Sequence, residues 1–170
     1  MTNGTKVKKR DGRIESLDLD KMHLMVDEAC KGLAGVSASQ VEMKSGIQFY
    51  DGITTAEIQE ILIKSASDLI DLDHPNYQFV AARLLLFALR KQLFGRMHEF
   101  PKLADHITKL AYDDVYDKDI FTKYSIEEIQ KAEGFIDHDR DFLFTYAGLR
   151  QVVDKYLVQD RSSGEVFETP

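Results

Sequence analysis

The segment from Lys8 to Arg13 concentrates cationic side chains around an Asp-Gly dipeptide, in a chain that is acidic overall. Lys9 and Arg10 stand directly before this dipeptide, and Asp18 follows at a position suited to cap the amino-terminal end of a helix. Lysine and arginine side chains form strong charge-assisted hydrogen bonds with phosphate, and the free N–H groups at a helix start also attract anions. The segment therefore predicts a polyphosphate site; a solvated hairpin with ordinary surface cations is the alternative interpretation.

A second group of polar side chains belongs to two later segments. Thr55 and Gln59 are one helical turn apart and share a face, where a hydroxyl and an amide can bond a base or a ribose. Lys91 ends a strongly apolar segment, on the same ridge as Phe87. Each has a simpler explanation, since Thr55 can be a helix cap and a lysine near a helix carboxyl terminus interacts well with the dipole.

Composition bounds the class of protein. The 170-residue chain is 44% hydrophobic, long enough to bury a core, and its formal net charge of -7 argues against non-specific binding to nucleic acid. Cys30 is the only cysteine, which excludes an internal disulfide framework and a multi-cysteine zinc site and fits a reducing compartment. No stretch has the apolar character of a signal peptide or a membrane span, so we expect a cytoplasmic protein that does not contact membranes.

Motifs of known catalytic sites are absent from the sequence. It holds no G-x-x-x-x-G-K-[ST] loop, no G-x-G-x-x-G and no G-x-S-x-G. The run from Asp137 to Asp141 contains His138 and suggests a metal or acid–base site, but consecutive residues point in different directions on a helix and alternate in a strand. We interpret this run as a charged loop between helices, and we predict no catalytic centre and no metal site.

The pattern of elements predicts a mainly α fold. A β-hairpin is expected over residues 5–16, with a two-residue type I′ loop at Asp11-Gly12. Four helices follow, of which the third opens with a capping box between Thr54 and Glu57, and the fourth is apolar nearly all round and central to its bundle. Their expected ranges are 18 to about 33, 37 to about 49, 54 or 55 to about 69, and 75, with Pro75 in the first turn, to about 94.

The residues around 95–101 are the predicted boundary, which divides the chain into regions 1–95 and 96–170. Further helical segments are expected at 102–112, 125–135 and 145–158, followed by a hairpin with its turn at 160–165. A two-stranded hairpin is marginal alone, so we expect it to continue into, or pair with, polypeptide outside this chain. The predicted architecture is thus a four-helix bundle capped by a small N-terminal β-hairpin or sheet, followed by further helices and a C-terminal β-hairpin.

Several of these segments together resemble a known family. They are similar to the ATP-cone of class Ia ribonucleotide reductase large (α) subunits, and the matching stretches are Val7–Gly12, Glu15, Leu19–Lys21, Gln48–Thr55, Tyr77–Arg83 and Leu89–Lys91. The likeness continues through Phe135–Asp141 and Lys155–Val158, which resemble the start of the same subunit's catalytic domain.

The resemblance implies a function for each region. Residues 1–95 would form an ATP-cone, the overall activity site at which ATP activates and dATP inhibits, with Mg²⁺ on the phosphates; residues 96–170 would form the helical N-terminal part of the catalytic domain. By position, the resemblance assigns phosphate contacts to Lys9, Arg10, Lys21 and Lys91. It assigns contacts with the ribose and base to Val7, Glu15, Leu17, Asp18, Met22, Thr55, Ile58 and Gln59.

The resemblance also implies partners outside this chain. They are the remainder of the large subunit, the radical-generating small (β) subunit, and further copies of the large subunit in a homo-oligomer. In the family, dATP promotes an assembly that interrupts radical transfer between subunits. The radical-bearing and redox cysteines of the family correspond to positions beyond residue 170, so we do not expect this chain alone to be an enzyme; it would be a regulatory part of an oxidoreductase, ribonucleoside-diphosphate reductase.

Two positions depart from the family's pattern. Asp18 stands where well-known bacterial members have asparagine near the adenine, and an ionised carboxylate can accept but not donate a hydrogen bond. Gln59 stands where the same members have histidine, so the affinity and the discrimination between ATP and dATP are expected to differ.

Two other functions remain open at this point. A transcriptional regulator that senses nucleotides through an ATP-cone carries a four-cysteine zinc ribbon before the cone, whereas Cys30 is alone in this sequence. A stand-alone helical interaction module would use the basic hairpin to bind an acidic partner surface.

Overall fold

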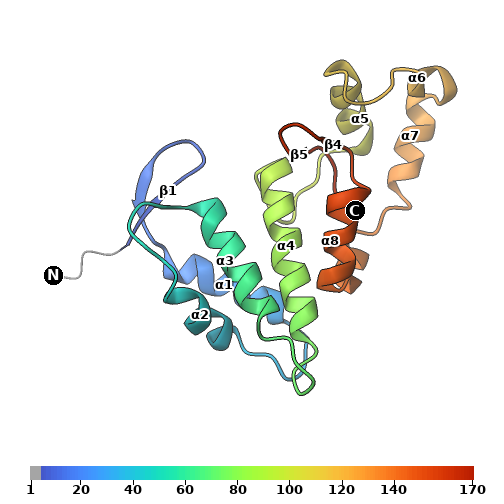
Figure 1. The fold of residues 1–170 in the computed structure, drawn as a ribbon. Coiled ribbons are helices and arrows are strands. Elements are labelled where there is room, and N and C mark those ends of the chain that lie inside the picture. The colour runs from blue at the N-terminus through green and yellow to red at the C-terminus, as the bar shows by residue number, and fades with distance from the viewer. Residues whose placement is uncertain (1–4) are drawn as a thin grey trace.

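A computed structural model describes residues 5–170, and Figure 1 shows how their elements are arranged. Residues 1–4, which the predicted first region includes, lie outside the described part of the chain. The elements are β1 (Lys6–Lys8), β2 (Ile14–Ser16), α1 (Leu19–Cys30), α2 (Ala38–Gly46), β3 (Ile53–Thr54), α3 (Thr55–Ser67), α4 (Tyr77–Phe94), α5 (Leu103–Tyr112), α6 (Ile120–Lys123), α7 (Ile126–Glu133), the 3-10 helix η1 (His138–Leu143), α8 (Tyr146–Lys155), β4 (Gln159–Asp160) and β5 (Glu165–Val166). The prediction of a mainly α fold is confirmed.

A three-stranded sheet in the order β2-β1-β3 lies at the end of the helices where α3 begins and α4 ends (Figure 1). Its central strand pairs antiparallel with β2 and parallel with β3, so that Val7 faces Glu15 on one side and Ile53 on the other. Val7 and Ile53 are buried, which anchors the sheet on the helical core. Strand β3 was not predicted, because two residues are too few to show an alternating pattern.

The loop of the first hairpin is longer than the sequence predicted. Lys9 N donates to Arg13 O (2.8 Å) and Gly12 N donates to Lys9 O (3.0 Å), which leaves the three residues 10–12 in the loop. Gly12 has a φ of +85°, whereas Asp11 has no positive φ, so the predicted type I′ turn is wrong. The Asp11 side chain accepts a hydrogen bond from Arg13 N (3.0 Å), which favours the longer loop and places Arg10 in the turn itself.

Helix starts agree with the predicted caps in two cases. Asp18 Oδ1 accepts from Lys21 N at 3.0 Å and caps α1. Thr54 and Glu57 form the complete capping box at the start of α3. Ser37 precedes α2 as predicted, but its side chain makes no capping hydrogen bond.

Several helix ends differ from the predicted ones. Helix α1 ends at Cys30 rather than near residue 33, because Lys31 N and Leu33 N bond three residues back in tight turns. Helix α2 ends at Gly46 rather than near Phe49, because the following backbone N–H groups bond three residues back in tight turns. Helix α4 begins at Tyr77, so Pro75 lies in the turn before the helix and not in its first turn. The predicted end of α4 before Gly95 is confirmed, since Gly95 has a φ of +74°.

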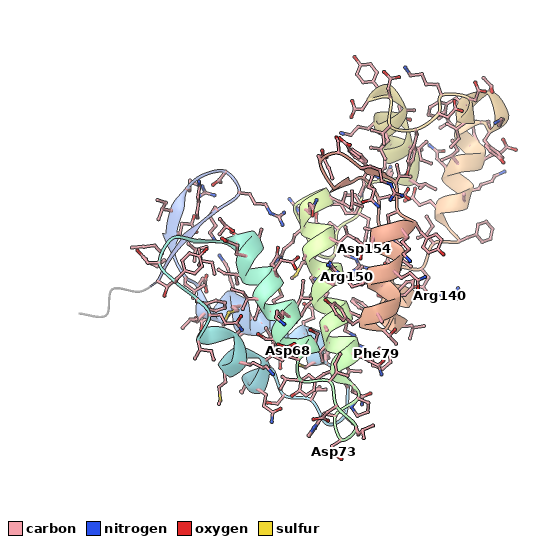
Figure 2. All side chains as sticks on the ribbon, in the orientation of Figure 1. Asp68, Asp73, Phe79, Arg140, Arg150 and Asp154 are labelled. Atoms are coloured by element: carbon pink, nitrogen blue, oxygen red, sulfur yellow. The ribbon has the colours of Figure 1, made fainter. Side chains whose placement is uncertain are left out.

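Helix α4 is the central helix of the structure, as its apolar surface predicted. It stands between α1–α3 on one side and α8 on the other (Figure 1), and it packs against α1, α3, α8 and η1. Arg150 and Asp154 mark the position of α8 along α4 (Figure 2). Leu149 of α8 is fully buried in the same core as Phe87 of α4, so the two predicted regions share their packing.

The segment after α4 contains two elements that the sequence did not reveal. Helix α6 is a single turn. Residues 137–141 were expected to be a loop, but residues 138–141 belong to the 3-10 helix η1, which Asp137 caps by accepting from Asp139 N (3.1 Å). The helices α5, α7 and α8 lie within the expected ranges, although α8 ends at Lys155. Strands β4 and β5 form the expected hairpin.

Two further findings apply to residues 5–170 only. No helix in this range has the length and apolar character needed to cross a membrane. No group of three or more histidine, cysteine, aspartate or glutamate side chains gathers there as a metal site.

Candidate functional site

A small pocket of about 120 Å³ lies beneath the sheet, where it meets the starts of α1 and α3 and the last turn of α4. Five elements from distant parts of the chain contribute to its wall. The lining residues are Val7, Lys9, Ser16, Leu17, Asp18, Lys21, Met22, Met25, Thr55, Ile58, Gln59 and Lys91.

The pocket divides by chemistry into an apolar wall and a cationic rim. Met22 and Met25, three residues apart on α1, share a helix face, and Ile58 of α3 is buried opposite them. Thioether and aliphatic groups of this kind suit the face of a flat ring. Lysine side chains from β1's end, α1 and α4 provide the positive charge.

Within the described residues, Lys91 is the lysine of the pocket that no carboxylate pairs with. Its ammonium is half-buried and lies 3.6 Å from the Met25 sulfur. Burial lowers the pKa of Lys91, and the nearby charges of Arg10 and Lys9 lower it further. By contrast, Lys9 Nζ lies 3.4 Å from Glu15, and Lys21 Nζ lies 3.4 Å from Asp18. A bound anion would relieve the repulsion among these cations.

Arg10 connects the hairpin loop to two helices. Its Nη1 donates to the backbone carbonyl of Lys91, and its Nη2 donates to Gln59 Oε1 at 3.3 Å. The three-residue loop makes this contact possible because it places Arg10 in the turn facing α4. An arginine has five N–H donors, so these two bonds leave others available for an anion.

Gln59 and Asp18 have defined hydrogen-bonding roles. Gln59 is 5% exposed and lines the pocket; its carbonyl oxygen accepts from Arg10, so its amide N–H groups are the donors that it can offer a ligand. The Asp18 pKa is lowered, mainly because its carboxylate accepts from the backbone N–H of Lys21. Asp18 is therefore ionised at neutral pH and acts as an acceptor.

The structure brings together most of the residues that the sequence nominated. Ten of the twelve line the pocket, and the other two lie beside it: Arg10 bonds Gln59 and Lys91, and Glu15 pairs with Lys9. Thr55 donates to Lys8 O at 3.3 Å.

Sequence analysis missed two of the lining residues, Ser16 and Met25. The helical spacing of Met25 from Met22 was a usable signal, whereas nothing in the pattern marked Ser16.

A larger cavity of about 440 Å³ lies elsewhere, between α5, α7 and the segment after β5. Its walls include Phe94, Phe100 and Tyr116, and its charged groups include the carboxylates of Glu133 and Glu168. Carboxylates repel phosphate, so this cavity does not suit a polyphosphate despite its size. The smaller, cation-rimmed pocket is the better candidate.

Comparison with known proteins identifies the domain that contains this pocket. A family profile described as "ATP cone domain" matches residues 5–92, a range that includes every residue of the pocket. The chain is 48% identical over 169 residues to ribonucleoside-diphosphate reductase 1 subunit alpha of Escherichia coli, 47% identical over 169 residues to the alpha subunit of Haemophilus influenzae, and 41% identical over 164 residues to that of bacteriophage T4.

These matches cover 99%, 99% and 95% of this chain, respectively. The chain spans only 22%, 22% and 21% of the length of those relatives. The chain belongs to the ATP-cone family, in the form found in the N-terminal region of ribonucleoside-diphosphate reductase alpha subunits.

Proposed function

We propose that the pocket binds an adenine nucleoside triphosphate and serves as the overall activity site of a ribonucleoside-diphosphate reductase, with ATP as activator and dATP as inhibitor. One observation carries the proposal: cations from two distant segments, Lys9 and Arg10 of the hairpin loop and Lys91 of α4, converge at one small pocket with an apolar wall. In the described part of the chain, the charged groups that shift the pKa of Lys91 are themselves cations. Bringing these charges together costs free energy, which a polyphosphate would offset.

The size of the pocket supports a particular placement of the ligand. Its volume of about 120 Å³ is below the roughly 300–1,000 Å³ of pockets that enclose whole ligands. We place the base against the apolar wall of Met22, Met25 and Ile58, and the triphosphate along the cationic rim. Mg²⁺ would arrive on the phosphates, since the nearest carboxylates, Glu15 and Asp18, already pair with lysines.

Discrimination between ATP and dATP would depend on one hydroxyl group. Gln59 and Thr55 line the pocket from the same face of α3: Gln59 can donate through its amide N–H groups, whereas Thr55, whose hydroxyl donates to Lys8 O, can accept. A single hydrogen bond contributes about 1 kcal/mol, or roughly a fivefold difference in affinity. We therefore propose a modest preference at each site, amplified where several sites act in one assembly.

Regulation would act through other parts of the enzyme. The proposed partners are the remainder of the alpha subunit, further alpha subunits and the radical-generating beta subunit. A nucleotide can shift such an assembly only if its affinity differs between the assembled states.

Titration calorimetry of the chain with MgATP and MgdATP tests the proposal. We expect binding with a dissociation constant of about 1 mM or tighter. The double variant Lys9→Ala/Arg10→Ala should bind at least about tenfold more weakly, because it loses two charge-assisted contacts. No binding by a folded sample, or equal binding by the double variant, would refute the proposed site.

A further inference from the structure

Arg90 lies on α4 directly before Lys91 and the last turn of the helix, and is 2% exposed. Its Nη2 forms an ion pair with Asp141 Oδ2 of η1 at 2.8 Å and donates to the carbonyl oxygen of His138 at 3.0 Å. Asp141 is itself 8% exposed. A buried guanidinium is thus paired with a buried carboxylate across the boundary between α4 and η1.

Aromatic rings and a further carbonyl hold the same guanidinium. The Arg90 Cζ atom lies 4.7 Å from the ring centroid of Phe100 and 5.3 Å from that of Phe142. Its Nη1 donates to Met97 O at 3.4 Å. These partners come from the segment directly after α4 and from η1, so the end of α4 is tied to both.

Lys91, the next residue of α4, points toward the pocket instead of toward η1. Consecutive helical residues point about 100° apart, so α4 directs Arg90 toward η1 and Lys91 toward the pocket. The Lys91 carbonyl accepts from Arg10 and also from Gly95 N at 3.0 Å. The last turn of α4 therefore supplies the pocket with one ammonium group and with the acceptor that holds Arg10.

We propose that Arg90 is a positioning residue for the anion pocket: through its ion pair with Asp141 it holds the last turn of α4, and so Lys91 and Arg10, in the geometry that receives a polyphosphate. This inference rests on the proposed function of the pocket. Arg90 does not line the pocket, so it would act on a bound ligand only through Lys91 and Arg10.

The physical reason lies in the two-sided anchoring of one rigid turn. A buried ion pair gains little net stability because both charges lose hydration, but it restricts the position of its two partners strongly. Coupling between two sites is reciprocal, so a ligand that fixes Lys91 and Arg10 must also favour the paired geometry of Arg90 and Asp141. Binding in the pocket would then reduce the local opening of η1, which belongs to the region after the family match.

The first test measures affinity in the full 170-residue chain. Inorganic triphosphate and MgATP are titrated by calorimetry into the native protein, Asp141→Asn and the matched control Asp113→Asn. Asp113 pairs with Lys109 at 2.8 Å on the exposed surface of α5, so the control removes a carboxylate from an ion pair without touching α4. We expect a loss of affinity of about fivefold or more for Asp141→Asn and no change for Asp113→Asn.

The second test measures the local opening of η1. Hydrogen exchange of the amides of Arg140 and Phe144, which donate to Asp137 O and Asp141 O within or beside η1, is followed with and without saturating MgATP. We expect slower exchange with the ligand in the native chain and a smaller response in Asp141→Asn. A merely structural role would lower the unfolding midpoint of the variant but leave the affinity of its folded molecules and the exchange response unchanged.

The outcomes separate the two proposals. If the native chain binds neither ligand, the proposed function fails. If it binds but the η1 amides do not respond and Asp141→Asn binds normally, the positioning role is refuted while the nucleotide site stands. If Asp141→Asn does not fold, Phe142→Leu loosens the same clamp without leaving a buried charge unpaired, and normal affinity in that variant overturns the proposal.

Discussion

Replacing Lys91 with methionine tests the proposed site most directly, because affinity for the ligand should fall while the stability of the free protein is kept or rises. Methionine keeps much of the length and apolar surface of the lysine side chain and removes its charge. In the free protein, Lys91 is half-buried and repelled by Arg10 and Lys9, so the charge is unfavourable before any ligand binds. In the complex, the same charge would face a phosphate.

The magnitude follows from the lost contact. A hydrogen bond to a charged group contributes about 1.5–3 kcal/mol, and the lower half of this range applies because solvent still reaches the ammonium. A loss of about 2 kcal/mol weakens binding by roughly thirtyfold. The free energy of unfolding without ligand should stay within about 0.5 kcal/mol of the native value or rise, since repulsion is removed.

Calorimetry with MgATP and urea unfolding without ligand provide the two readouts. Lys64→Met is the matched control, because Lys64 also lies in the last turn of its helix and loses the same interaction with the helix dipole. The Lys64 side chain is far less buried than that of Lys91, and it pairs with Asp68 at 3.3 Å. Affinity in Lys91→Met equal to that of the control would show that Lys91 does not contact the phosphates.

Three further predictions concern pH, a helix end and the core. Contact with phosphate should raise the lowered pKa of Lys91, so between the pKa values of the free and bound states the complex holds more protons than the free protein. The affinity should therefore be full below the free-state pKa and decline as the pH rises through it. Calorimetry from about pH 7.5 to about pH 10 measures this decline, which should be weaker in Lys91→Met. Gly95→Ala should lower the free energy of unfolding in urea by about 1–2 kcal/mol, because Gly95 has a φ of +74°. Gly46→Ala should be nearly neutral, because Gly46 has no positive φ and has open space for a Cβ. Equal effects of the two substitutions would contradict the strain argument. Leu149→Ala should lower the free energy of unfolding by about 2–5 kcal/mol, because Leu149 is fully buried against α4. Leu143→Ala should lower it by less than about 0.5 kcal/mol, because Leu143 is 73% exposed. A small effect at Leu149 would argue against a shared core.

Local features of the chain were readable from the sequence. The caps at Asp18 and Thr54 and the stop at Gly95 depend on hydrogen bonds and backbone angles within a few residues, and the structure confirms them. The errors lie where local patterns compete: the Asp-Gly dipeptide suits a type I′ turn, but the Asp11 side chain bonds Arg13 N and a three-residue loop forms.

The candidate site was predictable in its members but not in its assembly. Lys9 and Arg10 were marked by charge around a turn, and the resemblance to a family added residues whose own patterns had simpler explanations. The division of the chain near residue 95 stays a prediction, although α8 packs into the same core as α4.

The sequence by itself determined the inventory of this protein: which segments are helical, which helix is apolar enough to be central, and which side chains can bind a polyphosphate. Tertiary structure alone decided which of them meet. Arg10 and Lys91 are 81 residues apart and touch because the hairpin loop reaches the last turn of α4, and Arg90 reaches Asp141 because η1 packs against another face of that helix. Periodicity reports which face of a helix is apolar, whereas the partner of that face depends on how all the helices pack, which no local pattern records.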